Sequence, residues 1–131
     1  MDNSRGKHVL VIDDEDIVRN TLRDILETDG YQVTDCHNGY EGIERFHQEH
    51  FDLVITDILM PKRDGIDTIV ALRQIEPTVK ILAISGAQRS ETLLEIANIF
   101  NADATLKKPF TREEILEVVK KIILAKGHTY L

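Results

Sequence analysis

The stretch Val9-Leu10-Val11-Ile12-Asp13-Asp14 sets four apolar residues directly before two acidic ones. A short apolar run rich in Val and Ile predicts a buried β-strand, here over residues 8–12, and the aspartates then stand at the carboxyl end of that strand. Four more such runs follow along the chain, at residues 32–37, 53–56, 80–84 and 104–107. The sequence therefore predicts five strands, several of them apolar on both faces.

Segments of helical period follow each predicted strand. Apolar residues recur at helical spacing within residues 17–26, 43–46, 66–73, 93–100 and 115–122. Local signals agree, because Gly30 follows the first segment, Asn101 suits the left-handed end of the fourth, and Thr111 with Glu114 forms a capping box before the last. Strand and helix alternate five times, which predicts an α/β fold: a doubly wound (βα)5 arrangement with a five-stranded parallel sheet and helices on both faces.

Length and composition favour one domain. The chain has 131 residues, of which 42% are hydrophobic and 30% charged, and we expect a domain over residues 7–126 between short tails at 1–6 and 127–131. The net charge of −7 makes nucleic acid and anionic membranes poor direct ligands. The apolar runs fall far short of the roughly 20 residues of a membrane-spanning helix. Without a secretory signal, and with Cys36 alone, the chain is expected to be cytoplasmic.

Chemistry-bearing residues stand where the predicted strands end. Asp13 and Asp14 follow the first strand, Asp57 the third, Ser85 the fourth and Lys108 the fifth. The carboxyl ends of parallel strands meet at one edge of the sheet, so these side chains are expected to lie together. Crowded carboxylates repel one another unless a cation is present, and Mg²⁺ prefers oxygen ligands that include phosphate. A carboxylate, a metal ion, an ammonium and a hydroxyl in one place favour phosphorylation of the carboxylate itself.

These motifs resemble the receiver domain of two-component response regulators. The matching segments are Val11-Ile12-Asp13-Asp14-Glu15, residues 53–65 around Asp57, Ile84-Ser85-Gly86, and Leu106-Lys107-Lys108-Pro109-Phe110. They occur in the order and spacing of that family and cover nearly the whole chain. The resemblance implies a flavodoxin-like fold and a part in a phosphorelay.

The resemblance also implies how Asp57 would be used. Asp57 would be the phosphoacceptor, with Asp14 as a direct Mg²⁺ ligand, Asp13 as a ligand acting largely through water, and the backbone carbonyl of Leu59 completing the protein ligands with Asp57. The phosphoryl group would come from phosphohistidine on a sensor histidine kinase or a histidine phosphotransfer protein. The chain would catalyse only its own phosphorylation and dephosphorylation, so it would not be an enzyme in the usual sense.

The same resemblance makes Ser85 the switch hydroxyl and Lys108 the lysine that contacts the phosphoryl group, with a cis peptide bond before Pro109. Thr105 is a departure, because the family usually has Tyr or Phe three residues before this lysine. A threonine cannot bury a ring, so we expect activation to be read out by displacement around Ser85 and the helix of residues 93–100. Output would reach a downstream protein through that helix, the strand at 104–107 and the final helix; the residues after the final helix are too few for an effector domain.

Two alternatives differ in class. A haloacid-dehalogenase-like phosphatase also uses an aspartate and Mg²⁺, but it needs an acid two residues after the nucleophile, where this chain has Leu59. A phosphorylation-independent interaction module would keep the fold without the chemistry, although Asp57, Ser85 and Lys108 are all present. A dinucleotide site is excluded, because no G-x-G-x-x-G motif follows the first strand.

The residues two positions after Asp57 and Ser85 yield a first prediction. These positions, where family members vary the hydrolysis rate, hold the apolar Leu59 and Ala87. Neither side chain offers a group that orients water, so we predict a long-lived phosphorylated form. The decay of labelled protein after removal of the phosphodonor measures its lifetime, and loss within seconds would contradict this prediction.

Overall fold

The five predicted strands form one parallel sheet. The computed structural model describes residues 6–58, 60, 65–86, 95–96, 98 and 100–125. Within these residues the strands are β1 (His8–Ile12), β2 (Gln32–Cys36), β3 (Leu53–Asp57), β4 (Ile81–Ser85) and β5 (Ala104–Lys107), in the order β2-β1-β3-β4-β5. The strand predictions are confirmed to within one residue; Asp57 and Ser85 are the last residues of β3 and β4 rather than the first residues after them.

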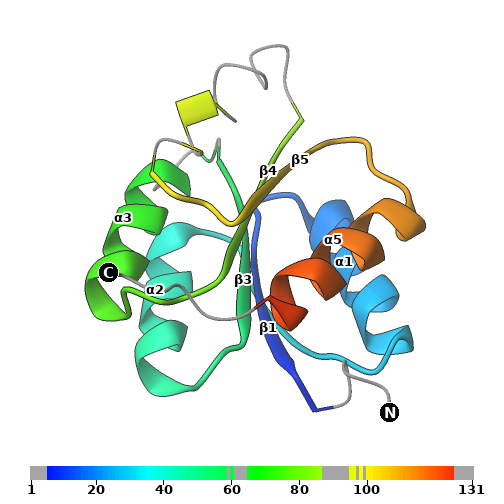
Figure 1. The fold of residues 1–131 in the computed structure, drawn as a ribbon, viewed down its shortest axis with the longest axis horizontal. Helices are drawn as coiled ribbons and strands as arrows, with labels where there is room; N and C mark the ends of the chain where they lie inside the picture. The colour runs from blue at the N-terminus through cyan, green and yellow to red at the C-terminus, as the bar shows by residue number, and fades with distance from the viewer. Residues whose placement is uncertain are drawn as a thin grey trace.

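Helices cover the sheet on both sides, as predicted. The described helices are α1 (Asp16–Thr28), α2 (Gly39–Gln48), α3 (Gly65–Ile75) and α5 (Arg112–Leu124). Figure 1 shows α2 and α3 on one face of the sheet and α1 and α5 on the other. The helix predicted around residues 93–100 lies largely outside the described residues.

Alternate residues of β1 face two separate cores. Leu10 and Ile12 belong to the cluster on the side of α2 and α3, whereas Val9 and Val11 belong to the cluster on the side of α1 and α5. All four side chains are fully buried. Because residues 9–12 of β1 have no solvent-facing side, no polar residue follows His8 until Asp13, at the edge of the sheet.

The helix boundary signals in the sequence are confirmed. Gly30 adopts a φ of 99° after α1, and Asn101 adopts a φ of 64°, the left-handed conformation expected of it. The Thr111 hydroxyl accepts a hydrogen bond from the Glu114 amide at 3.1 Å, and the Glu114 carboxylate accepts one from the Thr111 amide at 2.9 Å. This capping box fixes the start of α5 just after the loop that leaves β5.

Cys36 ends β2 inside the core. It is a free thiol with 2% of its surface exposed. Burial raises the pKa of this thiol to about 12, because the thiolate would lose its hydration. None of the described helices is long and apolar enough to cross a membrane.

The start of α3 yields a prediction about packing. A Cβ added to Gly65 would lie 2.1 Å from the backbone oxygen of Asp57 and 2.6 Å from the Cα of Ile58. Backbone atoms cannot rotate away, so we expect Gly65→Ala to lower the free energy of unfolding by about 2–3 kcal/mol. Urea unfolding measures this change. Gln74→Ala, at an exposed position of the same helix, is the control and is expected to stay within about 0.5 kcal/mol of wild type; equal stability of Gly65→Ala and wild type would contradict the packing argument.

Candidate functional site

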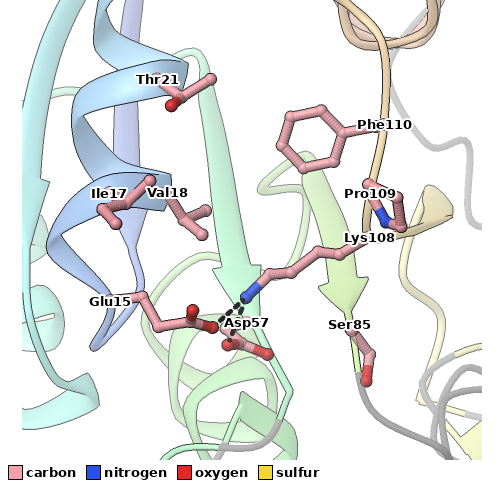
Figure 2. A pocket seen from close by; sticks show the side chains of 10 residues that line it. Glu15, Ile17, Val18, Thr21, Asp57, Ser85, Lys108, Pro109 and Phe110 are labelled. Carbon is pink, nitrogen blue, oxygen red and sulfur yellow. Dashed lines mark hydrogen bonds and ion pairs between the residues drawn. The ribbon is translucent and has the colours of Figure 1, made fainter.

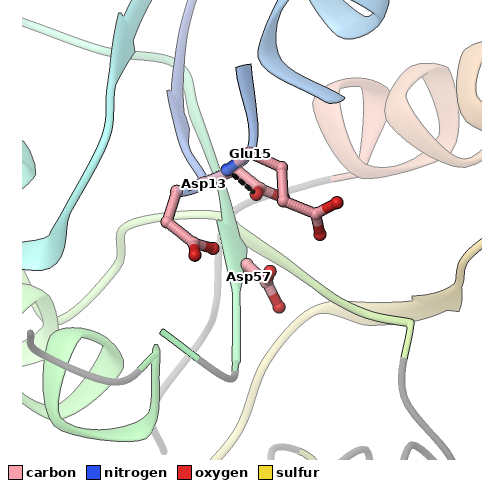
Figure 3. Close-up of side chains that lie close together, drawn as sticks. Asp13, Glu15 and Asp57 are labelled. Atoms are coloured by element: carbon pink, nitrogen blue, oxygen red, sulfur yellow. Dashed lines mark hydrogen bonds between the residues drawn. The ribbon is translucent and has the colours of Figure 1, made fainter. Parts of the chain in front are cut away.

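Four carboxylates gather at the carboxyl edge of the sheet. Oxygen atoms of Asp13, Asp14, Glu15 and Asp57 all lie within 4.8 Å of one another, and three of these side chains are drawn in Figure 3. Asp13 is fully buried and Asp57 is 3% exposed, whereas Asp14 and Glu15 are exposed. The strand-end prediction is therefore confirmed in its geometry for the three aspartates, and Glu15 joins them.

One ammonium group sits among these carboxylates. The Nζ of Lys108 lies 3.0 Å from Oδ2 of Asp13, 3.0 Å from Oε1 of Glu15 and 3.0 Å from Oδ2 of Asp57; Figure 2 shows the contacts with Glu15 and Asp57. Burial alone would lower the pKa of Lys108, but the hydrogen bonds with Asp13, Asp57 and Glu15 outweigh it and raise that pKa above its usual value. Lys108 is therefore charged at neutral pH and partly offsets the repulsion among the acids.

Asp13 is the most buried member of the cluster. Burial raises its pKa, while the hydrogen bond from the Glu15 amide to Oδ1, at 2.9 Å, and the nearby Lys108 act in the opposite direction. The second oxygen, Oδ2, is buried, and its charged neighbour among the described residues is Nζ of Lys108 at 3.0 Å. A desolvated carboxylate oxygen with spare lone pairs suits a cation.

Ser85 and Lys108 are held side by side through the backbone. The Lys108 amide donates to the Ser85 carbonyl at 2.8 Å. Ser85 is fully buried, and its Oγ has no hydrogen-bond partner among the described residues. A Cβ on Gly86 would lie 2.7 Å from Cδ of Lys108, so the glycine leaves room for the lysine stem. The Lys108–Pro109 peptide is cis, as the resemblance implied.

A cavity of about 510 Å³ opens over Asp57. Its polar lining consists of Glu15, Thr21, Asp57, Ser85 and Lys108, with Gly86 beside them. Apolar side chains form the rest of the wall, and Figure 2 shows them on two elements: Ile17 and Val18 on α1, and Pro109 and Phe110 after β5. The carboxylate of Asp57 is thus reached through an opening that is large enough for a small phosphodonor or an inserted side chain.

Two contributing residues were missed by the sequence analysis. Glu15 was named only as the last residue of the matching segment after the first strand and was given no role; its place as the third acid in succession after that strand was the available signal. Arg19 was not singled out in the sequence, yet its Nη1 donates to the Asp13 carbonyl at 2.7 Å and its Nε lies 3.5 Å from Asp35. Arg19 therefore ties the acidic loop to β2.

Three further residues of the sequence predictions lie outside the described residues or outside the site. Leu59 and Ala87 lie outside the described residues. Thr105 is a half-buried residue of β5, level with Ala83 in the neighbouring strand. It lies in the sheet rather than in the loops around Asp57, where Ser85 and Lys108 meet.

Comparison with known proteins identifies the family. A profile described as "Response regulator receiver domain" matches residues 9–120. The chain belongs to this family. Receiver domains are signalling modules of two-component systems, and the match sets aside the phosphatase alternative.

Individual relatives agree with this assignment. The chain is 33% identical over 118 residues to the chemotaxis protein CheY of Thermotoga maritima, covering 89% of this chain and 98% of that protein. It is 34% identical over 120 residues to the response regulator receiver protein CpdR of Brucella abortus, covering 91% and 98%. Among solved structures, TrrA of Thermotoga maritima superposes with a TM-score of 0.80 at 31% identity, covering 88% and 98%.

The buried acid Asp13 yields a prediction about stability and pH. Its pKa is raised, so ionised Asp13 costs folding free energy at neutral pH, and wild type recovers that cost as the pH falls toward the usual carboxyl range. We expect Asp13→Asn to stabilise the metal-free protein by about 1–2 kcal/mol at pH 7, and this advantage to shrink at pH 4. Thermal unfolding in the presence of a chelator measures it. Asp24→Asn, at an exposed position of α1, should change little; a destabilised Asp13→Asn at pH 7 would refute the electrostatic account.

Proposed function

We propose that Asp57 is the phosphoacceptor of this receiver domain. The observation that carries the proposal is the surroundings of its carboxylate: a cavity above it, an ammonium 3.0 Å from Oδ2, and the buried Ser85 hydroxyl in the same lining. A carboxylate becomes a useful nucleophile toward phosphorus when nearby cations neutralise the incoming group. All of these groups line the same cavity.

The donor set at this edge fits Mg²⁺. Asp13, Asp14 and Asp57 would hold the ion, together with the Leu59 carbonyl that the resemblance implies. The buried Oδ2 of Asp13, which lies 3.0 Å from Nζ of Lys108 and has further lone pairs to offer a cation, supports this assignment. The similar protein TrrA was solved in complex with Mg²⁺ and BeF, which supports the same ion here. When bound, Mg²⁺ would neutralise part of the negative charge on the carboxylates and on the phosphoryl oxygens.

The remaining residues have separate tasks in the proposed reaction. An oxygen of Asp57 attacks phosphorus in line with the leaving group, so that a new P–O bond forms as the bond to the donor nitrogen or oxygen breaks. Lys108 contributes a fixed positive charge to a phosphoryl oxygen. Ser85 donates its hydroxyl proton to another phosphoryl oxygen, which gives the buried Oγ the partner it lacks among the described residues. The acyl phosphate is later hydrolysed at the same place.

The proposed partners follow from the proposed chemistry. A phosphohistidine on a sensor kinase or a histidine phosphotransfer protein supplies the phosphoryl group, and a downstream protein reads the helix after β4 together with β5 and α5. On this proposal the domain comprises residues 7–126 and works in the cytoplasm. The half-buried Thr105 takes no part as a ring switch, so movement of Ser85 carries the signal.

Intact-mass analysis with acetyl phosphate and Mg²⁺ tests the proposal. Wild type is expected to gain one phosphoryl group, and this gain should disappear in Asp57→Asn and in wild type treated with a chelator, because the nucleophile or the ion is then missing. Asp24→Asn keeps the cluster intact and should be labelled like wild type. Equal labelling of Asp57→Asn and wild type would place the modification elsewhere and overturn the proposal.

A further inference from the structure

The side chain of Glu15 does not cap the helix at whose start it stands. Glu15 is the N-cap residue of α1, where side chains commonly accept a hydrogen bond from the first turn, yet its carboxylate makes no capping hydrogen bond. It reaches across to the loop after β5 instead, where Oε1 lies 3.0 Å from Nζ of Lys108. Figure 2 shows this contact at the side of the cavity, directly above Asp57.

Glu15 differs from the other two carboxylates near Lys108 in exposure. The side chains of Asp13 and Asp57 are 0% and 5% exposed, whereas that of Glu15 is 59% exposed. An exposed ion pair is weak and its side chain can leave at low cost. An ammonium has three N–H donors, and three carboxylates already surround this one. A phosphoryl oxygen therefore accepts a hydrogen bond from Lys108 most easily when the Glu15 carboxylate moves away.

We propose that Glu15 is a specificity-determining residue, which disfavours dianionic phosphodonors and competes with the phosphoryl group for Lys108. The inference rests on the proposed function of Asp57. A donor that enters the cavity passes the negatively charged carboxylate of Glu15, which lines it. Acetyl phosphate is a dianion at neutral pH, whereas phosphoramidate, whose P–N bond resembles that of phosphohistidine, is a monoanion. The carboxylate of Glu15 repels the first more strongly than the second.

Both donors give the same product through balanced steps. With acetyl phosphate, the Asp57 oxygen bonds to phosphorus as the P–O bond to acetate breaks, and acetate leaves with the electron pair. With phosphoramidate, the P–N bond breaks and the nitrogen leaves as ammonia, because it is already protonated in the donor. The two reactions differ in donor charge and leaving group. The ratio of their rate constants, taken within one variant, therefore removes any change in the reactivity of Asp57 that affects both donors equally.

The test compares second-order phosphorylation rate constants for the two donors, at saturating Mg²⁺ and low ionic strength. Glu15→Gln keeps the size of the side chain and removes its charge. A unit difference in donor charge a few ångströms from a carboxylate in a water-like medium corresponds to about a threefold effect. We expect Glu15→Gln to react faster with both donors and to raise the ratio of acetyl phosphate to phosphoramidate by about threefold. Added salt should shrink this difference between variant and wild type.

Asp24→Asn is the matched control, because it removes the same charge from an exposed position of α1 that does not line the cavity. Its donor ratio should equal that of wild type; an equal rise in both variants would mean that net charge alone acts, and would overturn the inference. An unchanged ratio in Glu15→Gln, with Asp57 still phosphorylated in wild type, overturns this inference alone. Absence of any labelling of wild type by either donor overturns the proposed function as well.

Discussion

Repulsion among carboxylates at one edge of the sheet is the constraint on which the rest of the site depends. Four acidic side chains have oxygens within 4.8 Å of one another, and two of the four are buried. Such an arrangement is stable only with positive charge in its midst, and Lys108 supplies it from the loop that follows β5. Gathering the acids costs free energy because they repel one another. The cluster therefore has an affinity for further cations, and for a group that arrives together with a cation.

The fold produces this crowding through the positions of the strand ends, and no special loop structure is needed. Parallel strands buried on both faces leave charged residues little place except their ends, and β1, β3, β4 and β5 all end at the same edge. The backbone bond from Lys108 to the Ser85 carbonyl, and the bond from Arg19 to the Asp13 carbonyl, then fix two of these loops relative to the sheet. Architecture brings the groups together, and local hydrogen bonds orient them.

Much of this arrangement could be predicted from the sequence. The apolar runs predicted the strands, and the helical spacing predicted the helices between them. The identity of the residues after each strand predicted which side chains meet. The direction of the Glu15 side chain could not be predicted, because a residue at a helix start either caps the helix or reaches outward, and the choice depends on Lys108, 93 positions along the chain. Likewise Asp57 and Ser85 fall just inside their strands, since pairing with neighbours extends β3 and β4 by one residue.

The buried thiol at the end of β2 has a practical consequence. A cysteine reacts with alkylating and maleimide reagents through its thiolate, and the pKa of about 12 for Cys36 leaves almost none of that form at neutral pH. The folded chain is therefore expected not to react with such labels. Single cysteines introduced on its surface would carry spin or fluorescent probes of motion, with no need to remove the natural one and disturb the core.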